Sequence, residues 1–181
     1  RIEKRLYEAY VKDNGQPPAI VLYDVTSSYF EGEHNELADY GYNRDGKKGK
    51  KQIVIGLLTG ADGEPLAVRV FEGNSADPST VAEQIDLLKQ QFGVSEVVFI
   101  GDRGMLKAKG KAVLGAQGWR YISALTKPQI RTLLKGGVLQ PDLFDEDIGE
   151  AIQEDTRLIV RRNERIQHRE RARRADKLKR L

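Results

Sequence analysis

The chain has 181 residues, of which 39% are hydrophobic and 31% charged, a composition ordinary for one globular domain with a sizeable core. It contains no Cys and only two His, so disulfides and thiolate metal sites are excluded and a His-rich zinc site is disfavoured. No apolar run is long enough to span a membrane, and no signal peptide is recognisable.

The net charge of +3 is distributed unevenly along the chain. Residues 44–51 and the stretch from residue 157 onward are basic, whereas residues 142–155 are strongly acidic. Basic blocks on an otherwise mixed chain are typical of proteins that contact phosphates. The simpler alternative for each block is a solvated charged face.

The first strand is predicted by the apolar run of residues 19–23, which follows a helical pattern over residues 1–11 and chain-breaking residues at 14–18. A short run of this kind is typical of a strand buried on both faces. It leads directly into Asp24, and a charged group is costly to bury unless it is paired, hydrogen-bonded or bound to a metal.

A long polar loop over residues 26–49 separates this strand from the next. Residues 52–59 form the second predicted strand. Asp62-Gly63 then turns the chain into a third strand, in which Leu66, Val68 and Val70 alternate. The first three strands are therefore expected to form an antiparallel meander.

A helix is predicted over residues 77–92, with Asp77 as its N-cap, Pro78 at its first position and Gly93 after its end. The strand of residues 97–100 follows and leads into Asp102. The remaining elements of this region are a helix over residues 105–117, a strand over 120–125 and a helix over 128–135.

This order of elements predicts an α/β fold with a ribonuclease-H-like mixed sheet, in which strands 1–3 are antiparallel and strands 4–5 parallel. In that layout the first and fourth strands are neighbours, which would bring Asp24 and Asp102 together near the point where strand order reverses. Two such carboxylates suggest a metal site, and oxygen ligands select Mg²⁺ or Mn²⁺. The alternative is that each Asp only ends its strand or caps the turn that follows.

The pattern changes after Gly137. Residues 142–152 are acidic and without a regular pattern, residues 156–162 have the composition of a strand, and residues 163–181 form a basic helical pattern. This last helix does not have the apolar face that would complete the core.

Several motifs, in the same order, resemble those of bacterial insertion-sequence transposases of the DDE class. The first-acid motif and the second-acid motif Asp-Arg-Gly are matched around Asp24 and by Asp102-Arg103-Gly104. The matching segments are YDVTSSYFEG (residues 23–32), YGYNRDGK (40–47), KKQIVIGL (50–57), FEGNSADP (71–78) and GDRGM (101–105).

The resemblance implies a core that holds Mg²⁺ or Mn²⁺ with two Asp and one Glu, and it places Asp24 and Asp102 in the first two roles. The expected activity is metal-dependent phosphodiester hydrolysis followed by strand transfer at insertion-sequence ends. Thr26 and Gly104 are expected to support the site. Candidates for contact with DNA are Arg44, Lys47, Lys48, Lys50, Lys51 and Arg103.

Family members insert a β-rich subdomain before the helix that carries the third acid in a Tyr-Arg-Glu-Lys-type signature. No such signature occurs in this sequence. We therefore expect residues 1–136 to be an incomplete catalytic core and residues 137–181 to begin the insertion and include the basic C-terminal helix. Without the third acid, this chain is expected to be inactive.

The expected partners are double-stranded DNA at transposon ends and target sites and a second copy of the protein, with no membrane. The expected location is the cytoplasm of a bacterium or archaeon, close to the nucleoid. Two alternatives to a transposase core are open: a related ribonuclease-H-fold metal nuclease, and a non-catalytic or degenerate fragment that binds DNA or oligomerises. A nucleotide-binding enzyme is a weaker option, because no glycine-rich phosphate-binding motif follows a strand.

Overall fold

The computed structural model describes residues 2–32, 34–42, 49–140, 148–161 and 163–179. These residues form two compact units, Arg1–Ala124 and Leu125–Leu181. None of the helices in the described residues is both long and apolar enough to cross a membrane.

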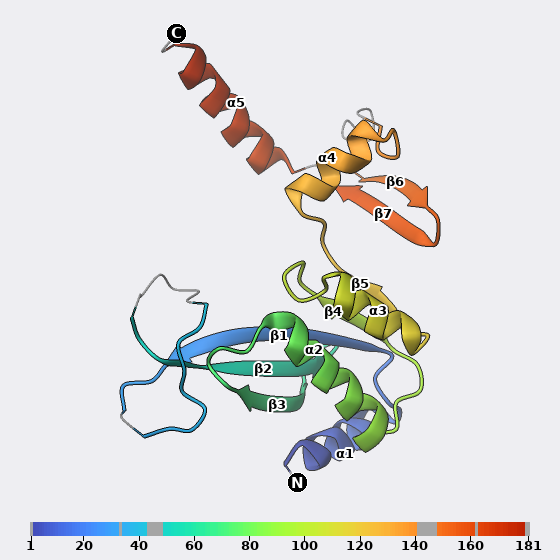
Figure 1. Ribbon diagram of the computed structural model, residues 1–181. Helices are drawn as coiled ribbons and strands as arrows, with labels where there is room; N and C mark the ends of the chain where they lie inside the picture. The colour runs from blue at the N-terminus through green and yellow to red at the C-terminus, as the bar shows by residue number, and fades with distance from the viewer. Residues whose placement is uncertain (1, 33, 43–48, 141–147, 162, 180–181) are drawn as a thin grey trace. The chain divides into compact units, whose positions relative to one another are not determined.

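The first unit is built on a five-stranded mixed sheet with the order β3-β2-β1-β4-β5 (Figure 1). β1 pairs antiparallel with β2 and parallel with β4, β2 pairs antiparallel with β3, and β4 pairs parallel with β5. The predicted ribonuclease-H-like mixed sheet, including the adjacency of the first and fourth strands, is confirmed. The strands are β1 (Ile20–Tyr29), β2 (Gln52–Gly60), β3 (Pro65–Phe71), β4 (Val98–Gly101) and β5 (Arg120–Ile122).

The helices of the first unit are α1 (Ile2–Asn14), α2 (Asp77–Asp86) and α3 (Ala108–Ala116). α2 continues into a π-helical turn, η1 (Leu87–Gln91). The helix predicted at residue 77 does begin there, but Ala76 rather than Asp77 is the N-cap residue, and no side chain caps this end. The structure thus corrects the predicted capping role of Asp77.

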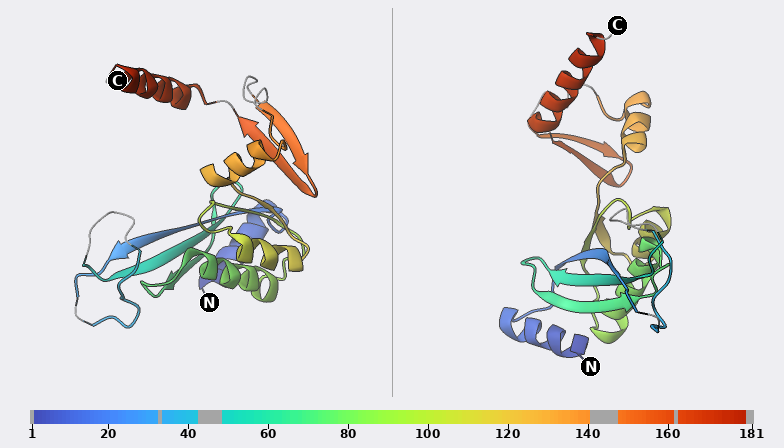
Figure 2. Two further views of the ribbon diagram at one scale, coloured as in Figure 1. Left: turned by 45° about the horizontal axis from the view of Figure 1, so that its top comes forward. Right: turned by 90° about the vertical axis from the view of Figure 1, so that its left-hand side faces the viewer.

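The core lies between one face of the sheet and these helices. Alternate residues of β1, Val21, Tyr23 and Val25, point into it, as the period of a strand requires. Val81 and Ile85 of α2 pack against them, and Figure 2 shows α2 and α3 along the same side of the strands.

α1 packs on the same face of the sheet. Its Tyr7 ring stacks on Phe92 with the ring centroids 4.1 Å apart. Arg69 of β3 ties α1 to α2, because its guanidinium group lies 3.0 Å from Glu3 and 3.6 Å from Glu83. In the described part of the first unit, the helices therefore cover one face of the sheet.

The opposite face of the sheet is open and apolar. The prediction that β1 is buried on both faces is wrong: its residues alternate between buried and exposed, because the described helices of this unit lie on one side only. The large apolar side chains on the open face are between 37% and 56% exposed, and they are Leu22, Leu57, Val68, Val70 and Ile122.

The second unit contains α4 (Lys127–Lys135), the hairpin of β6 (Ile148–Gln153) and β7 (Thr156–Arg161), and α5 (Glu164–Leu178). The side chain of Thr126 caps α4 in a capping box with Gln129. Residues 148–152 are predicted to be irregular and instead form most of β6, because they pair with β7 and include only one acidic residue, Glu150. No residue of α5 is buried.

Candidate active site

Asp24 lies within β1, and Asp102 directly follows β4, the neighbouring parallel strand. In the ladder between β1 and β4, Tyr23 is the partner of Gly101, and each of these residues is followed by one of the aspartates. Neighbouring strands lie about 4.8 Å apart, and side chains at equivalent positions point to the same face. The two aspartates therefore follow the last residue pair of this ladder, one on each chain segment.

Asp102 has a local structural role as well. Its Oδ1 atom accepts hydrogen bonds from the backbone N–H groups of Gly104 and Met105, each at 2.8 Å. This arrangement caps the turn that follows β4. A Cβ atom at position 104 would lie 3.2 Å from that oxygen, so a glycine suits the close approach. The capping alternative is thus correct for one oxygen of Asp102, and its Oδ2 makes no hydrogen bond to the described residues.

The Asp24 carboxylate accepts one hydrogen bond from the described residues, fewer than the carboxylate of Asp102. Its Oδ1 accepts a hydrogen bond from the backbone N–H of the next residue, Val25, at 2.8 Å. Asp24 lies in the middle of β1, so it does not end its strand, and it is exposed on the open face of the sheet. In each aspartate, Oδ2 therefore has no hydrogen bond to the described residues and can bind a ligand.

The two carboxylates lie on a mainly apolar surface. Across the ladder to β2, Asp24 is the partner of Leu57, and Leu22 lies two residues before it on the same face of β1. Unpaired negative charges about 4 Å apart repel by roughly 4 kcal/mol at an effective dielectric constant of 20. A divalent cation removes this repulsion, and carboxylate oxygens are the ligands that Mg²⁺ and Mn²⁺ prefer. The donor set fits such an ion with two protein ligands.

A third protein ligand is not found beside them. Among the described residues, no group of three or more His, Asp or Glu side chains is arranged to hold a metal ion. Glu154 lies in the turn between β6 and β7, and Glu164 and Glu170 lie on α5, all in the second unit.

Thr26 and Arg103, which are predicted to act at the site, lie within two positions of an aspartate in the sequence. Thr26 is exposed two residues after Asp24, and so it points to the same face of β1. Arg103 is exposed in the turn that Asp102 caps. Lys50 and Lys51 lie directly before β2, and the predicted contacts Arg44, Lys47 and Lys48 are outside the described residues.

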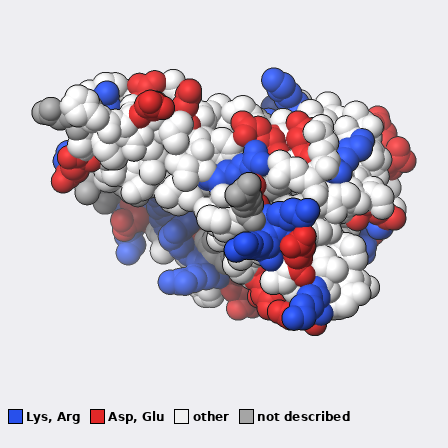
Figure 3. Space-filling model, turned by 90° about the horizontal axis from the view of Figure 1, so that it is seen from below, with Lys and Arg blue, Asp and Glu red and all other residues white. Residues whose placement is uncertain are grey.

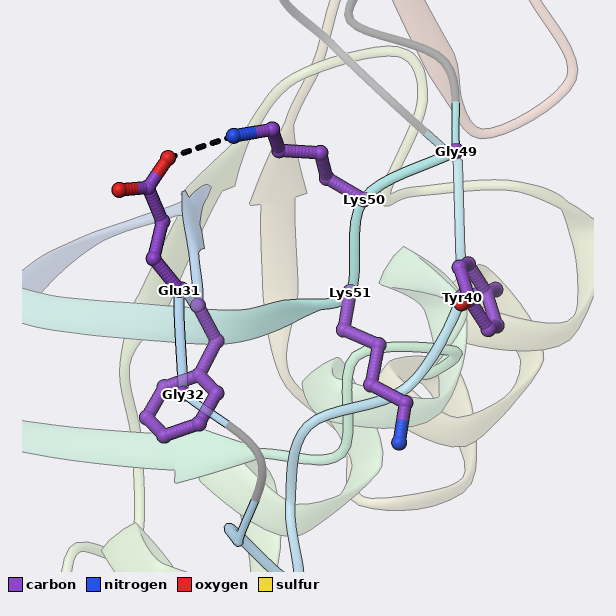
Figure 4. A pocket seen from close by; sticks show the side chains of 7 residues that line it. Glu31, Gly32, Tyr40, Gly49, Lys50 and Lys51 are labelled. Carbon is purple, nitrogen blue, oxygen red and sulfur yellow. Dashed lines mark hydrogen bonds and ion pairs between the residues drawn. The ribbon is translucent and has the colours of Figure 1, made fainter.

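The two described lysines differ in their surroundings. Lys50 Nζ lies 2.5 Å from the carboxylate of Glu31, whereas Lys51 makes no ion pair with the described residues (Figure 4). Elsewhere on the surface, basic side chains lie beside acidic ones on the face seen in Figure 3, so no patch of a single sign covers that face. Lys51 is therefore the better candidate for an attractive contact with phosphate.

A junction of three chain segments at the end of β1 was not predicted from the sequence. The buried side chain of Gln52 donates hydrogen bonds to the carbonyl groups of Gly73, at 2.9 Å, and Tyr42, at 3.1 Å. Gln52 and Asp39 also exchange backbone hydrogen bonds, and Asn74 donates to the Asp39 carboxylate at 2.7 Å. The junction fixes residues 39–42 beside β2.

Glycines are the sequence signal that marks this junction. A Cβ atom at Gly41 would lie 1.9 Å from the carbonyl oxygen of Gly73, and one at Gly73 would lie 1.9 Å from the carbonyl oxygen of Gln52. Both glycines occur in the motifs of residues 40–47 and 71–78, so close backbone approach is a physical reason for them.

The mixed sheet has a ribonuclease-H-like fold. The sequence profile of the transposase DDE domain matches residues 15–181, and the chain belongs to this family. No curated protein sequence matches the chain.

Solved structures of transposases have a similar fold. The piggyBac transposase in a synaptic complex with hairpin DNA matches with a TM-score of 0.50 and 12% identity over 80% of this chain and 30% of that chain. The Mos1 transposase in a paired-end complex with the left transposon end matches with a TM-score of 0.41 and 12% identity over 71% and 43% of the two chains. A Mos1 mariner paired-end complex with Mn matches with a TM-score of 0.40 and 13% identity over 71% and 43%. The chain therefore spans less than half the length of each of these proteins.

Proposed function

We propose that this chain forms part of the catalytic core of a DNA transposase of the bacterial insertion-sequence type. In this proposal the whole protein hydrolyses the phosphodiester at the ends of its element and joins the freed 3′-OH to target DNA. The single observation that supports the proposal is the register of β1 and β4, in which Asp24 and Asp102 each follow one member of the pair Tyr23–Gly101. Membership of the DDE transposase family supports it.

Asp24 and Asp102 are the proposed metal-binding catalytic residues, each using the oxygen that the structure leaves uncommitted. When bound, Mg²⁺ or Mn²⁺ would activate water and stabilise the leaving oxygen of the phosphodiester. The residues around the pair position it: the cap on Asp102 fixes one carboxylate, and Thr26 and Arg103 are proposed to orient ligands or the scissile phosphate.

We further propose that the third carboxylate of the site comes from a helix that packs on the open face of the sheet. Apolar side chains surround the two aspartates on that face, and a layer of apolar residues is stable only when another element covers it. Such a helix would bring a Glu to the aspartates while its own apolar side chains bury Leu22, Leu57 and Val68. Residues 137–181 are proposed to begin the subdomain that precedes it.

The partners in this proposal are double-stranded DNA and a second copy of the protein, with Lys50 and Lys51 beside the DNA backbone. Contacts of this kind position the duplex without reading its sequence. The proposed location is the cytoplasm, close to the nucleoid.

Titration calorimetry with MnCl₂ on this chain tests the metal site. We expect binding to the unmodified chain and loss of the heat in Asp24→Asn and in Asp102→Asn, which keep the shape of each side chain and remove its charge. Asp86→Asn, at the end of α2, is the matched control and should bind as the parent does. Equal heats from the parent and both site variants would contradict the assignment.

A second candidate function is supported by the lack of a third acidic ligand among the described residues. In this alternative the chain is a non-catalytic piece that binds DNA or oligomerises. The two candidates differ in one measurement, because supercoiled DNA incubated with the full-length protein and Mn²⁺ should be nicked only if the site is catalytic. We expect this chain alone to leave such DNA intact.

A further inference from the structure

A hollow at the far end of β1 is separate from the aspartate pair. Its volume is about 410 Å³, which lies in the range of roughly 300–1,000 Å³ that is usual for small-ligand sites. The hollow is formed where the chain leaves β1, at Phe30 and Gly32, and where it enters β2, at Lys50 and Lys51 (Figure 4). Phe30 lies six positions after Asp24 along an extended chain that rises about 3.3 Å per residue, so the two sites are about 20 Å apart.

Aromatic rings line the hollow. The ring of Phe30 lies directly against Gly32: a Cβ atom at that glycine would be only 2.5 Å from the ring. Tyr40 also lines the hollow and is 60% exposed. Tyr42, two residues further on, is 83% exposed. Exposed rings next to a hollow offer flat apolar faces to a planar ligand.

The hollow carries one positive charge that no acidic side chain among the described residues balances. Figure 4 shows Lys50 directed toward Glu31, and the resulting ion pair of 2.5 Å largely cancels both charges. The side chain of Lys51 points away from this pair and has no ion pair with the described residues. An anionic group beside Lys51 would therefore meet an uncompensated ammonium group.

The aromatic side of the hollow is held in place. Tyr40 lies between two residues that the junction with Gln52 fixes, Asp39 through its backbone and Tyr42 through its carbonyl group. A ring presented from a fixed backbone loses little entropy when a ligand covers it, so it binds more strongly than a ring on a free loop.

We propose that this hollow binds an unpaired nucleotide of DNA, with its base against Tyr40 and Phe30 and its phosphate beside Lys51. Stacking on aromatic rings and a nearby cation are the two elements of single-strand recognition. A base within an intact duplex has both faces covered by its neighbours, so the rings favour an unpaired base. The inference rests on the proposed function, because it takes DNA to be the partner, and it adds a contact with separated strands.

Fluorescence anisotropy with a labelled twelve-residue oligo-dT and a blunt hairpin duplex of similar length tests the inference on the full chain. We expect Tyr40→Ala to weaken oligo-dT binding about 5- to 150-fold, the range found when a stacking ring is removed, while Tyr40→Phe stays close to the parent. Duplex binding should be the same in all three proteins. Lys51→Ala should reduce the salt slope of oligo-dT binding by about 0.7, the value for one single-strand phosphate.

Controls separate this inference from its alternatives. Lys4→Ala, which removes an exposed lysine from α1, should leave both affinities unchanged. Equal weakening of duplex and oligo-dT by Tyr40→Ala, or no weakening at all, would overturn the inference, as would binding of free thymidine monophosphate as tight as that of oligo-dT. Thermal unfolding midpoints equal to that of the parent establish that the variants are folded.

The experiments distinguish failure of the proposed nucleotide site from failure of the proposed metal site. Loss of the preference for oligo-dT together with normal Mn²⁺ binding would overturn the nucleotide site alone. Absence of Mn²⁺ binding together with a stacking-dependent preference for oligo-dT would overturn the metal assignment alone.

Discussion

Tyr23 of β1 is the ladder partner of Gly101 of β4, and the residue after each of them is an aspartate. Because this pairing precedes both aspartates, the proposed metal site depends on the register of two strands that are far apart in the sequence. The first prediction follows from this relationship.

Manganese should stabilise the folded chain, and the stabilisation should depend on both aspartates. A ligand that binds only the folded state raises stability with its concentration. We expect the thermal unfolding midpoint to rise in millimolar MnCl₂ for the parent but not for Asp24→Asn or Asp102→Asn. In the absence of metal, each variant should be at least as stable as the parent, since the repulsion between the carboxylates is removed. A midpoint that rises equally in all three proteins would place the ion elsewhere.

The cap made by Asp102 should be separable from its proposed role as a ligand. Asp102→Asn retains an oxygen that can accept hydrogen bonds from the N–H groups of Gly104 and Met105, whereas Asp102→Ala does not. We expect the alanine variant to be less stable than the asparagine variant by about 1–2 kcal/mol in urea denaturation, the usual cost of a lost cap. Equal stability of the two would show that the cap contributes nothing.

The junction at Gln52 should be intolerant of added volume. In Gly41→Ala the new methyl group would meet the Gly73 carbonyl at 1.9 Å, and we expect a loss of about 1–3 kcal/mol in urea denaturation. Gly115→Ala in α3 is the matched control, because a Cβ atom there meets nothing within 4 Å. A helical alanine at that position should stabilise the chain by up to about 1 kcal/mol. A Gly41→Ala protein as stable as the parent would contradict the described packing.

The buried phenol of Tyr23 should make stability depend on pH in the alkaline range. The pKa of Tyr23 is raised from 10.0 to about 12, mainly by burial; the Glu83 and Asp77 carboxylates act in the same direction, while the Thr80 hydroxyl and Arg69 oppose it. The Thr80 hydroxyl donates to the Asp77 carbonyl at 2.7 Å, and the phenol oxygen has no hydrogen-bond partner among the described residues, so burial is the main cause of the raised pKa.

The sign of this dependence follows from the raised pKa. The protonated phenol favours the folded chain, so its contribution is complete below pH 10 and is lost as pH rises toward about 12. We expect the difference in unfolding free energy between the parent and Tyr23→Phe to change by at most about 1.4 kcal/mol per pH unit in that window and to be constant below it. Parallel curves for the two proteins up to pH 12 would contradict the burial of this hydroxyl.

The sequence was sufficient to predict which strands of the sheet are neighbours, whereas the meeting of the two aspartates stays a prediction. Each depends on patterns that act locally: the apolar runs that precede Asp24 and Asp102, the turn at Asp62-Gly63, and the handedness of the crossover that follows residue 77. These patterns determine which strands are neighbours.

Other features depend on contacts that no local pattern encodes. An unbroken apolar run such as residues 19–23 does not reveal which face of a strand a helix will cover, and the open face was therefore missed. The double role of Asp102 needs the conformation of the turn after β4. The burial of Gln52 results from three segments meeting, and a single glutamine at the start of a strand gives no sign of it. The strand β6 was missed because the sequence directly before it, residues 142–147, is mostly acidic, although β6 itself has one acidic residue, Glu150.

The open face of the sheet has a consequence for handling the protein. Five large aliphatic side chains on one face of the sheet form an exposed hydrophobic patch. Two chains can bury this patch against each other, so concentrated solutions of this chain should form transient face-to-face pairs. Replacing Leu57 and Val68 by threonine would keep a residue type that favours β-strands and would make the open face more polar. The altered chain should then scatter less light at high concentration, while strand order and the aspartate pair stay as they are.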